Sequence, residues 1–165
     1  LGDVDIGSLD VLLLRTEMTV LDRPNIVETS IEDYLRLADP NADPAEMLAA
    51  LRLVGLDDRI SMLEDGMQTR LSFTGYPLSV AKTMQVKLAA AILSRPKVLV
   101  LSPLYDTVPV KWMENVFAHF EGKETTIRPE ALRLDGYLWI GPEQQAIVTE
   151  WEAFDAMREQ WKRER

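Results

Sequence analysis

The chain has 165 residues, of which 47% are hydrophobic and 27% charged, a balance typical of one soluble globular domain. Its 27 acidic and 18 basic residues give a net charge of −9, which disfavours nucleic-acid backbones and anionic lipid as main partners. The absence of cysteine excludes disulfides, thiolate catalysis and cysteine-based zinc sites, and a single histidine disfavours a histidine-based metal site.

The apolar runs are short. The longest, Leu88 to Leu93 and Val98 to Leu101, fall well below the ~20 residues needed to cross a bilayer, so we predict no membrane span. The first ten residues, LGDVDIGSLD, have neither a basic start nor an apolar h-region and do not form a secretory signal. They also lack an initiating methionine, which favours a fragment of a longer protein.

The first clear element is a strand over Met18 to Leu21. Residues 22–25, DRPN, interrupt it with turn chemistry, and Pro24 cannot donate to a strand ladder. The chain is therefore expected to change direction at this point.

Three short helices are predicted next. Ser30 supplies an N-cap hydroxyl for a helix over Ile31 to Leu37, and Asp43 caps a second helix that Gly55 ends. Residues 56–63 predict a third helix. The apolar residues expected to pack from the second and third helices are Met47, Leu48, Leu51, Val54, Ile60, Met62 and Leu63.

A longer helix and a buried strand follow. Ser79 predicts the N-cap of a helix that runs to about Ser94, where Arg95 and Pro96 break it. Its apolar positions, Met84, Leu88, Ala91 and Ile92, follow the spacing of one buried face, and the polar positions expected to lie away from that face are Lys82, Gln85 and Lys87. The continuously apolar run from Val98 to Leu101 is typical of a parallel strand covered on both faces, so the predicted fold class is α/β.

The last third predicts a helix over Trp112 to Phe120, strands at Tyr137 to Ile140 and Ala146 to Val148, and an amphipathic helix over 150–165. His119 is expected to be a surface or packing residue rather than a catalytic one. The tryptophans are expected in the core rather than on a ligand-stacking surface; they are Trp112, Trp139, Trp151 and Trp161.

Two further groups of residues each have a structural and a functional interpretation. The acidic stretch 39–46 lacks the spaced oxygen ligands and central glycine of a calcium loop, which favours a solvated connection between helices. Four methionines could form an adaptable docking patch, but filling gaps in a small core is the favoured interpretation; they are Met47, Met62, Met67 and Met84.

The order of these elements resembles the ATP-binding cassette of ABC transporters. The stretch from Gly75 to Pro103, GYPLSVAKTMQVKLAAAILSRPKVLVLSP, resembles the cassette signature helix followed by the Walker B strand. Residues 15–35, RTEMTVLDRPNIVETSIEDYL, resemble the Q-loop region, and Glu64 to Leu71 resembles the exporter-type L-x-D-G-x-x-T-x-[LV] pattern. Residues 1–10 resemble the segment that follows the Walker A helix.

The resemblance implies one partial nucleotide-binding domain over 1–165, with a partial P-loop NTPase core and an α-helical subdomain. The helical subdomain is expected at about 30–94, the remaining α/β core at about 1–29 and 95–150, and a C-terminal helix at 151–165.

Residue by residue, the resemblance also implies that the hydrolytic groups are lost. Ser102 and Pro103 replace the Walker B Asp-Glu pair, which would hold magnesium and orient water. Asp22 replaces the Q-loop glutamine and lacks its amide donor. Asp106, the nearest carboxylate after Ser102, is expected to be a turn residue rather than a displaced metal ligand.

The signature LSGGQ is replaced by Leu78, Ser79, Val80, Ala81 and Lys82. Two glycines that let backbone N–H groups approach a γ-phosphate are thereby lost. Ser79 and Lys82 remain candidates for a weak phosphate contact at a helix N-terminus, although a solvated surface lysine is the favoured interpretation.

Two further cassette features are missing from the sequence. The chain contains no GxxxxGK[ST] phosphate loop. Ile127 is followed directly by Arg128 and Pro129 where a strand and the switch histidine are expected, which indicates a deletion or gap of about one strand.

The resemblance implies part of an exporter-type nucleotide-binding domain, an ATPase by family but catalytically degenerate, that couples or supports transport. Its expected partners are a transmembrane domain or subunit and a second cassette, on the cytoplasmic side of a membrane, with no nucleic acid. ATP and Mg are implied as cofactors only by the resemblance, and no metal site is predicted. The alternative is a non-transporting scaffold or regulatory module derived from such a cassette.

Overall fold

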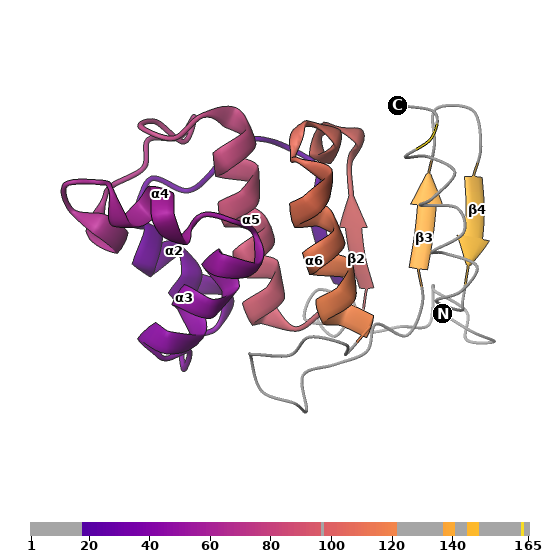
Figure 1. Ribbon diagram of the computed structural model, residues 1–165, viewed down its shortest axis with the longest axis horizontal. Coiled ribbons are helices and arrows are strands. Elements are labelled where there is room, and N and C mark those ends of the chain that lie inside the picture. The colour runs from indigo at the N-terminus through magenta and orange to yellow at the C-terminus, as the bar shows by residue number, and fades with distance from the viewer. Residues whose placement is uncertain (1–17, 97, 122–136, 141–144, 149–162, 164–165) are drawn as a thin grey trace.

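A computed structural model describes residues 18–96, 98–121, 137–140, 145–148 and 163 (Figure 1). Two short sheets are present in these ranges. Strand β1 (Met18–Leu21) pairs in parallel with β2 (Val98–Leu101), with Met18 opposite Val98 and Leu21 opposite Leu101. Strand β3 (Tyr137–Ile140) pairs with β4 (Gln145–Val148) in the antiparallel sense. The predicted strands and the mixed α/β class are confirmed.

Helices fill the connection between β1 and β2. They are α2 (Ile31–Ala38), α3 (Pro44–Leu53), α4 (Asp57–Ser61) and α5 (Val80–Ser94), with a short 3-10 helix η2 (Gly66–Gln68) before α5. After β2 come the 3-10 helix η3 (Pro103–Thr107) and α6 (Val110–Glu121). Figure 1 shows α5 between the cluster α2–α4 on one side and α6 with β2 on the other.

The three predicted N-caps form because each side chain accepts a hydrogen bond from a first-turn amide that has no helical partner. Ser30 accepts from Asp33 N at 3.0 Å, and Ser79 accepts from Lys82 N at 3.4 Å. Asp43 makes a complete capping box with Glu46, over distances of 2.8 and 2.9 Å. The starts of α2, α3 and α5 are therefore determined by local sequence.

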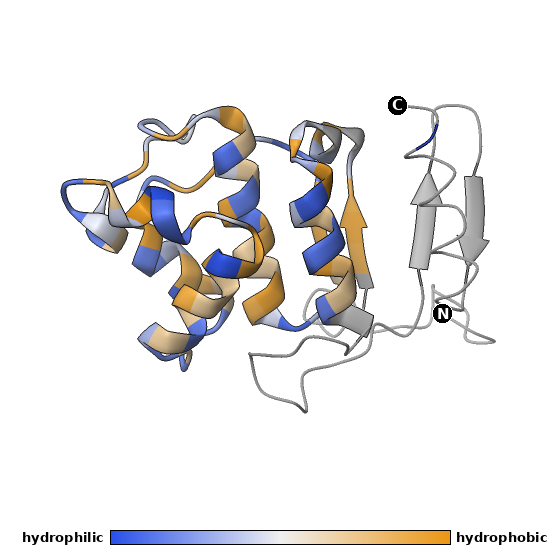
Figure 2. Cartoon of the chain, viewed as in Figure 1, coloured by the Kyte–Doolittle hydropathy of each residue, from blue (hydrophilic) through white to orange (hydrophobic). Residues whose placement is uncertain are grey.

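Helix α5 is the centre of the core. It packs against α2, α3 and β1, and its residues from Thr83 to Leu93 are buried except for Lys87, which is half-buried. Where Figure 2 colours them, β2 is hydrophobic and α6 mixes hydrophobic and hydrophilic residues. The sequence predicted that only one face of α5 is buried, whereas the helix is buried on nearly all sides.

Several predicted packing positions were wrong. Gln85, expected away from the core, is 5% exposed because its side chain has a hydrogen-bond partner in the core. Leu48 and Met62, expected to pack, are 38% and 77% exposed because the turns of α3 and α4 direct them outward. Met47 and Met84 are fully buried, so these two methionines fill the core as expected.

Helix α6 begins two residues before its predicted start and covers the end of α3. Gly55 adopts φ +72°, and an added Cβ there would lie 2.1 Å from Trp112 Cε2. Trp112 is partly buried against the core, as predicted, and His119 is 2% exposed, so it is a packing residue. The other three tryptophans lie outside the described residues or in strands whose side chains are not described.

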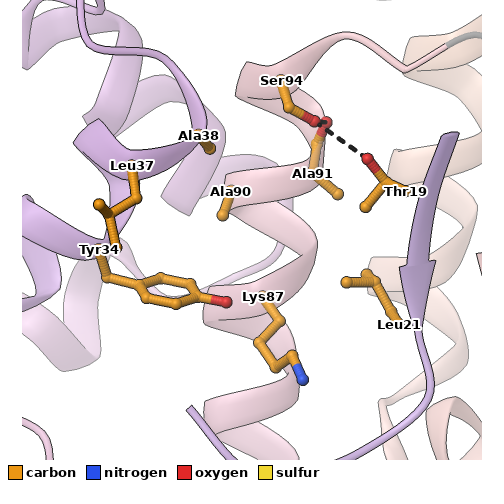
Figure 3. Close-up of a pocket in the computed structure, with 9 residues that line it drawn as sticks. All are labelled: Thr19, Leu21, Tyr34, Leu37, Ala38, Lys87, Ala90, Ala91 and Ser94. Atoms are coloured by element: carbon orange, nitrogen blue, oxygen red, sulfur yellow. Dashed lines mark hydrogen bonds between the residues drawn. The ribbon is translucent and has the colours of Figure 1, made fainter. Parts of the chain in front are cut away.

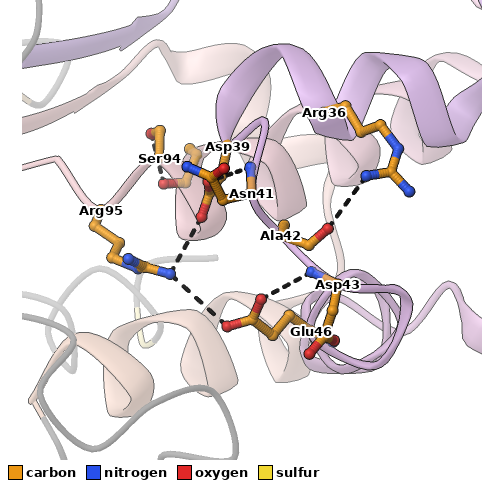
Figure 4. A network of polar contacts seen from close by, with 9 residues as sticks. Arg36, Asp39, Asn41, Ala42, Asp43, Glu46, Ser94 and Arg95 are labelled. Carbon is orange, nitrogen blue, oxygen red and sulfur yellow. Dashed lines mark hydrogen bonds and ion pairs between the residues drawn. The ribbon is translucent and has the colours of Figure 1, made fainter.

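A polar network fastens the end of α5 to the α2–α3 connection (Figure 4). Arg95, the C-cap of α5 at φ 51°, places Nη2 3.2 Å from Asp39 Oδ2 and 3.9 Å from Glu46 Oε1. The acidic stretch 39–46 is thus a helix connection, as expected, and two of its carboxylates face an arginine.

Leu99, Val100 and Leu101 are half-buried, so β2 is less covered than the sequence predicted, since a two-stranded sheet leaves much of each strand open. Within the described ranges, none of the helices combines the length and the apolar character that crossing a bilayer requires. The predicted gap near Ile127 and the C-terminal helix over 150–165 fall outside the ranges that the structure describes, apart from residue 163.

Candidate functional site

The carboxyl ends of β1 and β2 meet at one edge of the parallel sheet. The Ser102 N–H donates to the Leu21 carbonyl at 3.0 Å, so the residues that follow the two strands, Asp22 and Ser102, are neighbours. In α/β proteins this edge is where ligands bind. The structure therefore brings together two positions that the sequence singled out, one from each strand.

Asp22 is the carboxylate at this edge. Its Oδ2 lies 3.5 Å from Arg23 Nε, and the two side chains are 59% and 78% exposed. An ion pair so open to water contributes little to stability. Asp22 can attract a cation, but its carboxylate has no N–H to donate.

Ser102 ends β2 with a short hydroxyl. Its Oγ is shielded from solvent and has no hydrogen-bond partner among the described residues. The helix η3 begins at the next residue, and Tyr105 N donates back to Ser102 O at 3.0 Å. The chain thus turns away from the strand immediately. Asp106 lies within η3, in agreement with its predicted place in a turn.

Tyr105 adds a phenol that was not among the predicted site residues. Its side chain is 3% exposed, and its hydroxyl has no partner in the described part of the chain. Burial raises the pKa of Tyr105, and the nearby Tyr34 and Asp22 raise it further. The phenol is therefore a protonated donor at neutral pH. An aromatic residue three positions after a strand gives no recognisable signal for this role.

This set of donors does not fit a magnesium nucleotide. Magnesium in proteins is usually bound by one or two carboxylates together with phosphates and water, in a strict octahedron. The strand ends offer one exposed carboxylate, one buried hydroxyl and one buried phenol. Across the described residues, no three His, Asp or Glu side chains are grouped so that they could hold a metal ion.

The residues predicted to correspond to the cassette signature, Leu78 to Lys82, lie at the start of α5. Leu78 is buried, whereas Val80 is 53% exposed and Lys82 is half-buried. The hydroxyl of Ser79 is engaged as the helix cap, and Thr83 returns two hydrogen bonds to the Ser79 carbonyl, at 2.8 and 3.1 Å. Figure 1 shows that α5 begins at the same end of the molecule at which β2 ends. A phosphate contact at Ser79 and Lys82 stays a prediction.

A cavity of about 260 Å³ lies between α2, α5 and β1 (Figure 3). Tyr34 extends from α2 toward Lys87 of α5, and Thr19 of β1 faces Ser94 across 3.4 Å between their hydroxyl oxygens. Burial raises the pKa of Tyr34. Burial also lowers the pKa of Lys87, while the charge of Asp22 acts in the opposite direction.

Lys87 connects this cavity to the loop that carries Asp22. Its Nζ donates to the carbonyl oxygens of Arg23 and Asn25, the latter at 3.1 Å. Lys87 was predicted from the sequence to lie away from the buried face of the helix. Its spacing from the buried Met84 (i−3) and Ala91 (i+4) was a signal that it borders the core.

The geometry can be compared with known proteins. No family model matches the chain. The chain is 35% identical over 98 residues to the cyclolysin secretion/processing ATP-binding protein CyaB of Bordetella pertussis, a match covering 59% of this chain and 14% of that protein. It is 31% identical over 102 residues to the mycobactin import ATP-binding/permease protein IrtB of Mycolicibacterium thermoresistibile, covering 61% of this chain and 18% of that protein.

A solved structure of a bacterial Atm1-family ABC exporter with ATP bound has the same fold over 71% of this chain and 21% of that chain, with a TM-score of 0.63 at 19% identity. Part of this chain is homologous to the ATP-binding cassettes of ABC exporters. The mixed α/β fold with its small parallel sheet matches such an exporter. The homologous segment is a small part of each relative, so the activity and partners of a whole transporter are matters for proposal.

Proposed function

We propose that this chain is part of an exporter-type nucleotide-binding domain that supports or couples transport without hydrolysing ATP at its own strand ends. The observation that carries the proposal is the pair Ser102-Pro103 directly after β2, held beside Asp22 by the hydrogen bond from Ser102 N to Leu21 O. Phosphoryl transfer requires charge neutralisation and a positioned water. A serine hydroxyl and a proline ring supply neither.

The first turn of α5 supports the same proposal. A glycine at its first helical positions would let the backbone approach a phosphate closely. Val80 and Ala81 place side chains on that turn, and the hydroxyl of Ser79 already serves the amide of Lys82. The turn is suited to starting a helix more than to receiving an anion.

We propose further that residues 1–165 form one partial nucleotide-binding domain, with its helical subdomain at about 30–94, its partial P-loop NTPase core at about 1–29 and 95–150, and a C-terminal helix at 151–165. The cluster of α2–α5 supports the first boundary. The expected partners are a transmembrane domain or subunit and a second cassette, and the expected place is the cytoplasmic side of the membrane. The homology to exporter cassettes supports these assignments.

The test uses the intact protein that contains this chain. Binding of a fluorescent ATP analogue and ATP hydrolysis are measured with magnesium for the wild type, Ser102→Ala and Asp22→Asn. We expect both variants to match the wild type, because neither residue serves hydrolysis. A loss of turnover of about tenfold or more in either variant would show an active site at these strand ends and overturn the proposal.

Fractionation of cells without detergent separates this proposal from a non-transporting scaffold. A protein that supports transport is expected in the membrane fraction with its transmembrane partner. Recovery of the intact protein wholly in the soluble fraction would favour the scaffold or regulatory module.

A further inference from the structure

The loop that carries Asp22 is attached to α5 by one side chain. Residues 22–25 leave β1 through a turn in which Pro24 has no N–H to donate. The carbonyl oxygens of Arg23 and Asn25, on either side of Pro24, both accept hydrogen bonds from Lys87 Nζ. In the described part of the chain these two oxygens accept no other hydrogen bond.

The ammonium group is well matched to this task. It has three N–H donors and no acceptor, so it can serve two converging carbonyl oxygens at once. Its burial has an electrostatic cost that such hydrogen bonds offset. The charge of Asp22 also acts on Lys87, so the loop supplies two carbonyl acceptors and a nearby negative charge.

The position of Lys87 on α5 determines which parts of the fold its hydrogen bonds connect. The helix begins at Val80, beside the degraded signature, and Lys87 lies two turns later on the side that faces β1 and α2 (Figure 3). Its neighbours toward the C-terminus include Ala90 and Ala91, whose small side chains leave room for the cavity beside the lysine stem. One side chain therefore spans from the central helix to the loop after β1.

We propose that Lys87 is a positioning residue that fastens the loop of residues 22–25 to α5, so that the loop and the helix move as one unit. The biological role of this attachment rests on the proposed function. A cassette that supports transport needs motion to pass between the sheet edge and the helical subdomain. The attachment itself can be tested without nucleotide.

The test is amide hydrogen exchange in the intact protein. Ile26 N, directly after the loop, donates to Phe73 O at 3.1 Å and reports on the loop. Leu71 N donates to Thr29 O at 2.8 Å and serves as the internal reference. We expect Lys87→Met to speed exchange at Ile26 by about tenfold, because charge-assisted hydrogen bonds are among the stronger ones, and to leave Leu71 unchanged.

Two variants complete the test. Lys87→Arg keeps a multiple N–H donor and is expected to restore protection of Ile26. Lys82→Met removes the same charge from the same helix, but no hydrogen bond or ion pair joins the Lys82 ammonium to a described residue, so wild-type exchange is expected.

Unchanged exchange at Ile26 in Lys87→Met overturns the inference. If Lys87→Met loosens the whole fold and both amides accelerate, the arginine variant decides: restored protection of Ile26 supports the attachment, and failure to restore it overturns it. Hydrolysis traced to Ser102 or Asp22 would overturn the proposed function and leave these exchange results as they are, so the two failures are distinguishable.

Discussion

The side-chain amide of Gln85 donates a hydrogen bond to the main-chain carbonyl of Val54, with 2.5 Å between Nε2 and the oxygen. Both residues are buried, Gln85 at 5% exposure and Val54 at 0%. Val54 is the C-cap of α3, where carbonyl groups lack helical partners. The contact therefore satisfies a buried helix end from the centre of α5.

Replacing Gln85 by Met should lower the free energy of unfolding by about 1–3 kcal/mol, because the Val54 carbonyl would stay buried without this donor. Urea denaturation measures the change. Gln68→Met is the matched control: Gln68 Nε2 lies 2.6 Å from Glu32 Oε2 in an exposed contact. The free energy of unfolding of Gln68→Met should fall by less than about 0.5 kcal/mol. Equal losses in the two variants would contradict the role assigned to Gln85.

Gly55→Ala should destabilise the protein by about 2–5 kcal/mol. The variant combines a left-handed backbone, at φ +72°, with a Cβ that would lie 2.1 Å from the Trp112 ring. The measurement is the shift of the denaturation midpoint.

Gly66→Ala separates these two causes. Gly66 has φ +53° and no atom within 4 Å of an added Cβ, so only the backbone strain of about 1–2 kcal/mol is expected. If both glycine variants lose the same stability, then the approach of Trp112 to Gly55 has no energetic consequence.

Tyr105→Phe should leave stability at neutral pH unchanged or raise it by up to about 1 kcal/mol. The variant removes a hydroxyl that is buried without a partner among the described residues, and keeps the ring. A loss of more than about 1 kcal/mol would mean that the hydroxyl makes a stabilising contact.

The same variant should change the alkaline limb of the stability curve. The pKa of Tyr105 is raised from its ordinary value of 10.0, mainly by burial. Above that pH the unfolded chain has lost the phenolic proton while the folded chain keeps it, so the free energy of unfolding falls as pH rises. Tyr34, whose pKa is also raised, contributes in the same direction. The pKa of Lys87 is lowered, so Lys87 makes the free energy of unfolding rise with pH just below its ordinary pKa of 10.5.

Both of those groups remain in Tyr105→Phe, so their effects cancel in the comparison. Denaturation at about pH 8, pH 10 and pH 11 should show a shallower fall for the variant than for the wild type. Parallel curves would contradict the assigned pKa shift.

Arg95→Met should cost about 1–3 kcal/mol, because Asp39 and Glu46 would face each other without the cation that now lies between them. The side chains of this group are between 11% and 25% exposed, so water compensates poorly. Double substitution with Asp39→Asn should recover part of the loss by removing one of the carboxylates.

Arg52→Met provides the comparison for an open pair. Arg52 lies 3.1 Å from Asp57, but its side chain is 69% exposed, so a loss below about 1 kcal/mol is expected. Chemical denaturation of both arginine variants tests the difference. A larger loss for Arg52→Met would show that burial does not govern these ion pairs.

Local sequence predicted the elements well. The caps Ser30, Asp43 and Ser79 act within three residues along the chain, and each helix starts where its cap placed it. The strands β1 and β2 have the predicted bounds because short apolar runs bordered by turn residues carry their own signal. The neighbouring positions of Asp22 and Ser102 follow from parallel pairing of those strands.

What the sequence did not predict depends on partners far along the chain. Gln85 is buried because a carbonyl at Val54 needs a donor, and Lys87 is oriented by carbonyls of the loop before α2. Tyr105 joins the strand ends through the turn that η3 makes after Ser102. Because Gln85 and Lys87 are polar, they were predicted to lie away from the buried face of the helix. No local sequence pattern indicates such tertiary contacts.

The parallel pairing of β1 with β2 also constrains how the chain is made. Strand β1 is synthesised before its partner β2, which follows only after all of α2–α5. Until then its main-chain edge is open to other strands, a known route to aggregation. Because the pairing of Met18–Leu21 with β2 joins residues far apart in the chain, its formation is expected to be a slow step of folding.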